Sequence, residues 1–257
     1  MRPTMILDDI EIIMLEDGSG PFFSPREEVF PATPEQWADA DAFDPGARTE
    51  DGEWLLRFRC FALRRPNGRV VLVDAGIGPA DAPSASWAPV PGRLPEELAD
   101  AGIERDDVET VVLTHVHTDH IGWAVTGGTP YFRNARYLLQ SADLPTFAFT
   151  GPLTATGQLD LLDGDARLAP GIEILATPGH TPGHQSVLVH DRLLVTGDLL
   201  VHALQLLHPT IEYAHEVDPA LARTSRLAAL GALGGDGILA TPHLTEPFLR
   251  MPATSAL

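Results

Sequence analysis

Lysine is absent from this chain, and all 17 of its basic residues are arginine. The chain carries 36 acidic residues, so its formal net charge at pH 7 is -19. Nucleic-acid binding requires a basic surface, and anionic membranes attract basic segments. The charge therefore argues against nucleic acid and anionic membranes as partners.

Cysteine is nearly absent as well, since Cys60 is the only one. A single cysteine allows no disulfide within the chain and no thiolate cluster, and its apolar surroundings predict a core residue. No apolar stretch reaches the ~18 residues of a membrane-spanning helix. The first residues carry Asp8, Asp9 and Glu11 in place of the basic region of a signal peptide. We therefore expect a cytoplasmic protein.

The length of 257 residues, of which 44% are hydrophobic, suits a single α/β domain over residues 1–257. Within it, residues 20–52 are rich in proline, acids and aromatics and show no periodicity. A segment of this kind predicts a lid, or an arm that packs on a neighbouring subunit of a homodimer. An ordered surface excursion is the alternative. Phe132, Phe147 and Phe149 are candidates to roof a pocket, with core filling as the alternative.

Apolar runs bounded by turn residues predict most strands. The first strand is expected at 6–15, and Pro66-Asn67-Gly68 predicts a hairpin between the strands 54–63 and 69–73. Helices are predicted at 94–101 and from Pro219 to about Leu233, where Asp218 is the N-cap and Gly234-Gly235 the stop. Further strands are predicted at 136–140, 172–177, 186–190, 193–196 and 238–241. This order of elements suits an αβ/βα sandwich.

The most informative stretch begins with the short apolar strand 111–113 and continues as His115-x-His117-x-Asp119-His120. It delivers four potential metal ligands within six residues, and a helix is expected from Ile121. A lone histidine is more often a hydrogen-bonded or surface residue, but four such residues after a buried strand indicate a metal site. Imidazole and carboxylate suit zinc or another first-row divalent ion. One tetrahedral ion could not use all four and still keep an open position, so the spacing predicts two neighbouring ions.

Three later turns add ligands of the same kind: Pro178-Gly179-His180, Thr196-Gly197-Asp198 and Thr241-Pro242-His243. Each follows an apolar, β-branched run. Ligands at the ends of successive strands can converge on one rim of a sheet, which is how residues distant in sequence form one site.

These seven positions resemble the metallo-β-lactamase-fold hydrolase superfamily in its dinuclear form. The resemblance implies two mixed sheets with helices on the outer faces. It also implies two divalent metal ions, with zinc expected and iron, manganese or cobalt as alternatives. One ion would be held by His115, His117 and His180, the other by Asp119, His120 and His243, with Asp198 as the bridge. Asp74 would orient a ligand histidine, and His184 is a further candidate to support the ligands.

The same resemblance narrows the reaction to hydrolysis, in which a metal-bridging hydroxide attacks a carbonyl centre. His117 stands where oxygen-reducing relatives have an acid, and Asp198 stands where β-lactam-specialised relatives have a cysteine or no bridge. A lactone or another neutral ester is therefore the expected substrate. The alternatives are a phosphotriester, a thioester as in glyoxalase II, and a metal-binding protein without turnover.

The segment Gly197–His202 resembles the branch of lactonases and methyl-parathion-hydrolase-like enzymes. Lactonases that act on acyl-homoserine lactones have a tyrosine three residues after the bridging aspartate, where this chain has Val201. His202 could supply the missing hydrogen bond to the substrate carbonyl, and a group from residues 20–43 is the alternative. A His202 side chain that faces the interior or solvent, outside the site, is the other alternative. The residues expected to act in catalysis are Asp119, Asp198 and His202.

Overall fold

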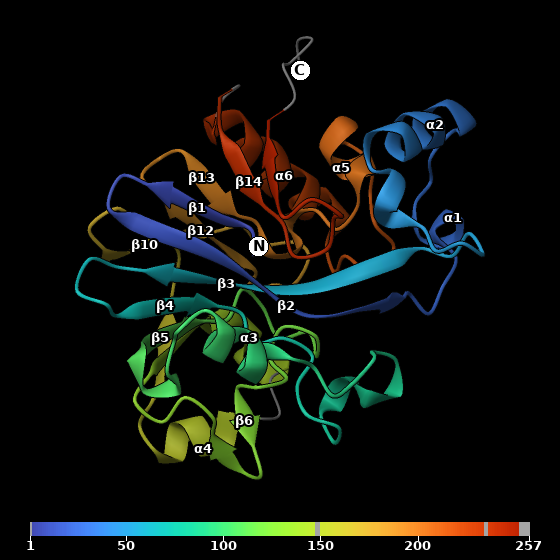
Figure 1. Ribbon diagram of the computed structural model, residues 1–257. Helices are drawn as coiled ribbons and strands as arrows, with labels where there is room; N and C mark the ends of the chain where they lie inside the picture. The colour runs from blue at the N-terminus through green and yellow to red at the C-terminus, as the bar shows by residue number, and fades with distance from the viewer. Residues whose placement is uncertain (1, 147–149, 234–235, 252–257) are drawn as a thin grey trace. The chain divides into compact units, whose positions relative to one another are not determined.

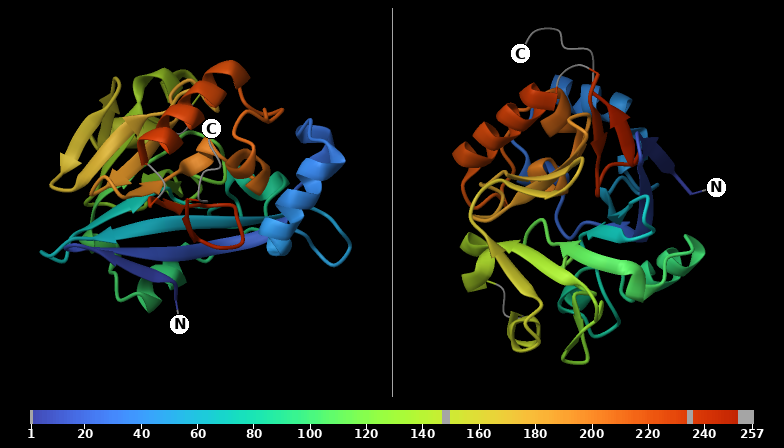
Figure 2. Two further views of the ribbon diagram at one scale, coloured as in Figure 1. Left: turned by 90° about the horizontal axis from the view of Figure 1, so that it is seen from above. Right: turned by 90° about the vertical axis from the view of Figure 1, so that its left-hand side faces the viewer.

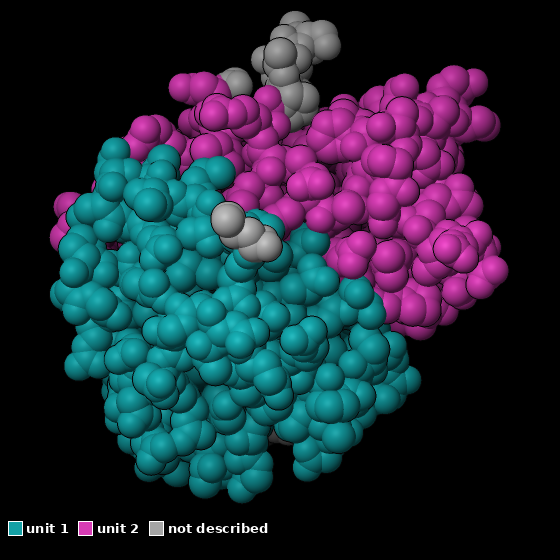
Figure 3. All heavy atoms as spheres, in the orientation of Figure 1, with its two compact units in different colours: residues 1–19, 58–165 teal, residues 20–57, 166–257 magenta. Residues whose placement is uncertain are grey.

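The computed structural model describes residues 2–146, 150–233 and 236–251 and folds as two compact units (Figures 1 and 3). Unit 1 comprises residues 1–19 and 58–165, and unit 2 comprises residues 20–57 and 166–257. Phe147, Phe149 and the predicted helix stop at Gly234-Gly235 lie outside the described residues. Among the described residues, no helix has the length and apolar character needed to cross a membrane.

Unit 1 contains a seven-stranded sheet in the order β1-β2-β3-β4-β5-β8-β9. Its strands are β1 (Thr4–Leu7), β2 (Ile10–Pro21), β3 (Leu55–Arg64), β4 (Val70–Val73), β5 (Val108–Val112), β8 (Arg136–Gln140) and β9 (Leu159–Leu162). A small hairpin, β6 (Val125–Thr126) with β7 (Thr129–Pro130), forms a separate sheet. The helices are α3 (Leu94–Asp100) and α4 (Thr150–Ala155), with 3-10 turns at Pro83–Ser86, Arg105–Asp107 and Ser141–Thr146.

The first strand differs from its prediction, because residues 6–15 do not form one strand. The chain turns at Asp8, whose φ of 52° is left-handed, and β1 pairs with β2 in an antiparallel hairpin. A short acidic turn between two apolar runs has no periodicity of its own, so sequence inspection merged the two strands. The hairpin predicted at Pro66–Gly68 is confirmed, since β3 and β4 pair antiparallel across it.

The core of unit 1 lies on the central strands. Cys60, Leu72 and Val111 have no exposed surface, and Leu94 and Leu98 of α3 pack into the same cluster. Phe132 is also fully buried in this cluster, which confirms core filling for that residue. Cys60 is the core residue that the sequence predicted, and burial raises the pKa of its thiol well above the ordinary value.

Parallel pairing of β4 with β5 decides where unit 1 presents its polar loops. Val73 is opposite Val112 in the register, so both strands end at the same edge of the sheet. Asp74 follows β4 at that edge, and the ligand loop follows β5. Two loops separated by 40 residues therefore meet because parallel strands point the same way.

Unit 2 contains a six-stranded mixed sheet in the order β10-β11-β12-β13-β14-β15. The strands are β10 (Ala166–Ala169), β11 (Ile172–Ala176), β12 (Gln185–Val189), β13 (Leu193–Val195), β14 (Ile238–Ala240) and β15 (Phe248–Arg250). Helix α6 (Pro219–Leu233) runs alongside this sheet (Figure 2). Its predicted start is confirmed, since Asp218 Oδ1 accepts a hydrogen bond from Leu221 N at 3.0 Å.

The segment 20–52 folds within unit 2. It forms α1 (Arg26–Val29), α2 (Pro34–Phe43) and a 3-10 turn at Pro45–Ala47. Helix α2 packs against α5 (Ala203–Leu207), and the two lie side by side in Figure 1. Whether the segment moves as a lid or meets a second subunit stays a prediction, as does the single domain over residues 1–257.

Candidate metal centre

The ligand loop of unit 1 runs from Thr114 to His120, directly after β5. No helix begins at Ile121, contrary to the prediction. The Gly122 and Trp123 amides donate to the carbonyls of Gly76 and Ala75, both at 2.7 Å. These bonds to a distant loop replace the i to i-4 bonds that a helix needs. Only glycine fits at 122, because a Cβ there would lie 2.2 Å from the carbonyl carbon of Ile77.

Asp74 organises this loop through both carboxylate oxygens. Its Oδ1 accepts from Thr114 N at 2.8 Å, and its Oδ2 accepts from Thr114 Oγ1 at 3.0 Å and from His120 Nδ1 at 2.8 Å. The proposed orienting role of Asp74 is thus confirmed for His120. Thr114 Oγ1 donates its proton to Asp74, so it accepts from His115 Nδ1 at 3.0 Å. His115 and His120 therefore both carry the proton on Nδ1 and present an Nε2 lone pair.

The four ligand candidates of unit 1 form two pairs. His115 Nε2 lies 2.9 Å from His117 Nδ1, and Asp119 Oδ2 lies 3.5 Å from His120 Nε2. The pairs belong to two separate groups of side chains that could each hold one ion. One loop thus contributes side chains to both groups, and binding of two ions by them stays a prediction.

The three ligand candidates of unit 2 follow strand ends at a single edge of its sheet. The register aligns Ala176 with Gln185, Val187 with Val195, and Val195 with Ala240. Accordingly His180 lies between β11 and β12, Asp198 follows β13, and His243 follows β14. Convergence at a sheet edge is confirmed for these three residues.

The turn that carries His180 packs closely against the start of α6. Gly179 has φ of 132°, and a Cβ there would lie 2.0 Å from Ala222 N. Val217 and Asp218 donate backbone hydrogen bonds to the carbonyls of His180 and Gly179. In this Pro-Gly-His turn, Gly179 therefore allows the close packing against α6, and His180 carries the imidazole.

Asp198 lies between two histidines. Its Oδ2 is 3.1 Å from His180 Nε2, and its Oδ1 is 2.9 Å from His243 Nε2. His243 Nδ1 donates to the Arg57 carbonyl at 2.7 Å, so the neutral ring would present an Nε2 lone pair to the carboxylate. Two acceptors at this separation repel unless a cation lies beside them. The donor set of buried imidazoles and a carboxylate thus fits divalent metal ions.

His184 accepts a hydrogen bond from the backbone of Asp198. It has no exposed surface, its Nε2 accepts from Asp198 N at 2.9 Å, and its Nδ1 lies 2.9 Å from Thr177 Oγ1. The predicted supporting role of His184 is confirmed as a contact to the backbone of Asp198.

His202 is buried, with 2% of its surface exposed, and it caps α5. Its Nδ1 accepts from Leu204 N at 3.1 Å, so the proton of the neutral ring is on Nε2. No hydrogen-bond partner for Nε2 occurs among the described residues. The rings of Phe30, Trp37 and Trp54 surround it, with centroids 5.4–5.5 Å away. Burial lowers the pKa of His202 to about 3.

Sequence inspection missed two buried polar networks, because neither has a motif. In unit 1, Asp17 accepts from the backbone of Leu94 and Ile77 and from Trp123 Nε1, and burial raises its pKa to about 6. In unit 2, Arg226 and Glu216 form a fully buried ion pair. The only local signal was the presence of charge in apolar surroundings.

The metallo-beta-lactamase superfamily model matches residues 59–237, more than half of the chain. An N-acyl homoserine lactonase of Bacillus sp is 30% identical over 102 residues, covering 38% of this chain and 39% of the lactonase. A hydroxyacylglutathione hydrolase of Acidiphilium cryptum (strain JF-5) is 34% identical over 127 residues, covering 49% of this chain and 44% of that enzyme. The chain thus matches less than half the length of each relative.

Solved structures extend the similarity in fold to the whole chain. The dizinc quorum-quenching lactonase AidC, in complex with a product, has a TM-score of 0.78 at 20% identity and covers 100% of this chain and 98% of its own. The hydrolase AbOPH of the beta lactamase superfamily has a TM-score of 0.77 at 21% identity, with the same coverage. The predicted fold class is confirmed. On the family model and the shared fold, the chain belongs to the metallo-β-lactamase superfamily.

Proposed function

We propose that this protein is a dinuclear metal-dependent hydrolase that cleaves a lactone or another neutral ester. The observation that carries the proposal is the placement of Asp198, whose two oxygens face two different histidines. A carboxylate in this position suits a bridge between two cations. Membership of the superfamily and the match to a lactonase support the same reading.

In this proposal His115, His117 and His180 would hold one ion, Asp119, His120 and His243 would hold the other, and Asp198 would contribute a ligand oxygen to each. Zinc is the proposed metal, because imidazole and carboxylate ligands suit it and a structural neighbour is a dizinc enzyme. When bound, two such ions lower the pKa of water and polarise a carbonyl oxygen.

The protein's own contribution is to hold the ligands and to place one hydrogen-bond donor. Asp74, Thr114 and the Arg57 carbonyl orient imidazoles so that each presents Nε2, and His184 holds the backbone of Asp198. We propose that His202 donates its Nε2 proton in a hydrogen bond to the substrate oxygen as negative charge develops there. It would replace the tyrosine that lactonases have at the position of Val201.

A thioester is the second candidate substrate, since the match to a hydroxyacylglutathione hydrolase is similar in extent to the match to the lactonase. Phosphotriesters remain an alternative. A protein that holds metal without turnover is the alternative outside enzymes. A cytoplasmic location is also proposed, on the support of the single buried cysteine and the strongly acidic composition.

A pH-stat screen of lactones, aryl esters, thioesters and phosphotriesters tests the proposal on protein loaded with zinc. We expect turnover of a lactone or ester, its loss with a chelator, and its return on adding zinc. Faster turnover of thioesters would favour the glyoxalase-like alternative. Stoichiometric metal without turnover of any substrate would leave only the metal-binding protein.

A further inference from the structure

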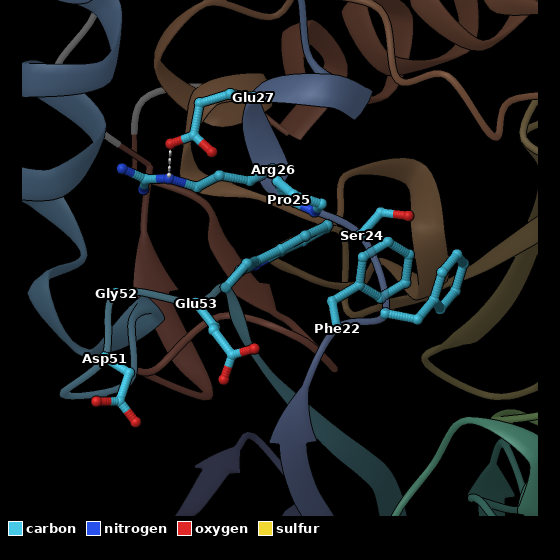
Figure 4. Close-up of a pocket in the computed structure, with 10 residues that line it drawn as sticks. Phe22, Ser24, Pro25, Arg26, Glu27, Asp51, Gly52 and Glu53 are labelled. Atoms are coloured by element: carbon cyan, nitrogen blue, oxygen red, sulfur yellow. Dashed lines mark hydrogen bonds and ion pairs between the residues drawn. The ribbon is translucent and has the colours of Figure 1, made fainter.

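The acids of this chain differ in what surrounds them. Figure 4 shows Glu27, Asp51 and Glu53 at a cavity of unit 2, and all three are exposed. Asp17 in unit 1 has no exposed surface. Hydrogen bonds from the protein therefore have to replace those that water gives to an exposed carboxylate.

Asp17, on β2, accepts hydrogen bonds from three other segments of unit 1. Its Oδ2 accepts from Ile77 N at 2.6 Å, and its Oδ1 accepts from Leu94 N at 2.5 Å and from Trp123 Nε1 at 3.2 Å. The Gly78 amide is a fourth donor. Burial raises the pKa of Asp17 to about 6, and these donors oppose the rise. At pH 7 the side chain is therefore ionised and connects the three segments.

Two glycines let the backbone close around this carboxylate. Gly76 has φ of 58°, and a Cβ there would lie 2.1 Å from Asp17 Oδ2. A Cβ at Gly92 would lie 2.3 Å from both carboxylate oxygens. Neither position has room for a side chain while Asp17 is in place. The backbone is thus fitted to the carboxylate from two sides.

The turn that Asp17 holds, residues 75–78, is also bound to the end of the ligand loop. Ala75 N donates to the His120 carbonyl at 2.7 Å, and the Gly122 amide donates back to a carbonyl of the turn at 2.7 Å. At Gly122 there is no room for a side chain between the two backbones. A shift of the turn would therefore move the end of the ligand loop with it.

The two halves of the ligand loop depend on this turn to different degrees. His115 and His117 follow β5 closely, and the Leu113 amide donates to a carbonyl of the neighbouring strand β8 at 3.0 Å. His120 lies further from the strand, and its carbonyl is bound to the turn. A loosened turn should therefore displace His120 and the adjacent Asp119 more than the first two histidines.

We propose that Asp17 is a positioning residue for one of the two ions, the one proposed for Asp119, His120 and His243. It acts through the turn 75–78 and through Trp123, and not by contact with metal or substrate. The inference rests on the proposed dinuclear hydrolase. It adds that a buried carboxylate outside the ligand set determines how tightly one of the two ions is bound.

Titration of the chelator-treated, full-length protein with Co²⁺ tests this role, because the visible absorption of cobalt follows the binding of each ion. We expect Asp17→Asn to weaken the binding of one ion by ~10–100-fold and to leave the other unchanged. Asparagine keeps one acceptor oxygen but turns an amide N–H₂ towards backbone donors. In a His243→Ala background, which lacks a ligand of the affected ion, Asp17→Asn should have no further effect.

Two variants serve as controls. Glu16→Gln is the matched one, because it neutralises the adjacent acid, whose partner is Arg59, and it should bind both ions as the native protein does. Leu153→Ala removes a fully buried side chain of the unit 1 core. It should lower Tm and leave both affinities unchanged. Equal weakening of both ions in Asp17→Asn, or selective loss of one ion in Leu153→Ala, would assign the effect to general destabilisation and overturn the positioning role.

A milder variant serves if Asp17→Asn does not fold. Trp123→Phe removes the indole N–H donor and keeps an aromatic ring, so it should weaken the same ion by about 3–10-fold, the range of one hydrogen bond. Full retention of both ions in Asp17→Asn, or in Trp123→Phe where the first variant is unfolded, would overturn the inference.

Metal binding and turnover together separate this inference from the proposed function. Selective loss of one ion in Asp17→Asn, with no ester cleaved by the native protein, would reject the hydrolase and retain the positioning role. Turnover by the native protein, with both ions retained in Asp17→Asn, would reject the positioning role alone. A native protein that binds a single ion would reject both.

Discussion

His202 shows how one side chain can serve two purposes through its two ring nitrogens. Nδ1 accepts from the Leu204 amide and thereby starts α5, which leaves the proton on Nε2. The surrounding rings of Phe30 and Trp54 offer no carbonyl or carboxylate to receive that proton. A buried donor kept in one tautomer suits an acceptor that arrives only with the substrate.

Removal of this donor gives the first prediction. His202→Ala should lower kcat for the best ester or lactone by ~10²–10³-fold with little change in KM, because the bond strengthens as charge develops. His202→Asn retains an oxygen to cap Leu204 and serves as the control for folding and metal content. Unchanged kinetics in His202→Ala, with both metals retained, would remove His202 from the reaction.

The low pKa of His202 gives a second prediction, which concerns stability. Burial holds the folded-state pKa at about 3, against 6.5 for an ordinary histidine. Between these values the unfolded chain binds a proton that the folded protein does not, so stability is lost as pH falls from 6.5 towards 3. At pH 5 this group alone costs about 2 kcal/mol.

The comparison of the native protein with His202→Asn isolates that cost, because asparagine does not titrate. Urea unfolding at pH 7 and pH 5 should show the native protein losing about 2 kcal/mol more than the variant. Parallel pH profiles for the two proteins would show that His202 is charged, or accessible to water, in the folded state.

At the scale of elements, the segment between β13 and α6 is held by one buried arginine. Arg226 of α6 donates to the carbonyls of Leu199, Pro209 and Ile211 and pairs with Glu216. Burial lowers the pKa of Arg226, and the charge of Glu216 opposes that change. Leu199 directly follows Asp198, so this hydrogen bond fixes the backbone next to the proposed bridging carboxylate against α6.

The third prediction tests the ion pair between Arg226 and Glu216. Arg226→Met should lower the free energy of unfolding by ~3–5 kcal/mol, because Glu216 is then a buried charge without a cation. Adding Glu216→Gln should restore part of the loss, since glutamine is neutral and keeps an acceptor for the Tyr213 amide. Urea unfolding of both single variants and the double variant measures the coupling. Additive losses would show that the two residues do not act as a pair.

For the whole molecule, metal content is the central quantity. Protein purified without chelator should contain close to two divalent ions per chain by elemental analysis. Asp198→Asn should lower metal affinity or activity by ~10–100-fold or more, because one ligand oxygen then becomes an amide nitrogen. If the native protein contains only one ion per chain and His243→Ala contains the same amount, the dinuclear centre is contradicted.

Chelation should also destabilise the molecule, because ions that bind only the folded state raise its stability by mass action. We expect Tm to fall when the metals are removed and to recover on adding zinc, with a smaller change in Asp198→Asn. A Tm that is independent of metal in the native protein would mean that the ligand loops are held by protein contacts alone.

The sequence by itself determined the fold class, and it located the candidate ligands and the loops that carry them. His115, His117, Asp119 and His120 lie close together in the sequence, directly after a buried strand. The same pattern, a strand followed by a polar turn, located His180, Asp198 and His243. Asp74 and His184 could also be predicted. These signals are local, because a few consecutive residues fix both the strand and the turn that follows it.

Only the tertiary structure decided the contacts between residues distant in sequence. Asp17 meets Leu94, Arg226 meets Leu199, and His202 meets the rings of Phe30 and Trp37. The chain at Gly122 bonds to a loop more than forty residues earlier and therefore forms no helix. Such contacts leave no periodicity in the sequence, because they depend on which buried polar groups find partners once the strands have aligned.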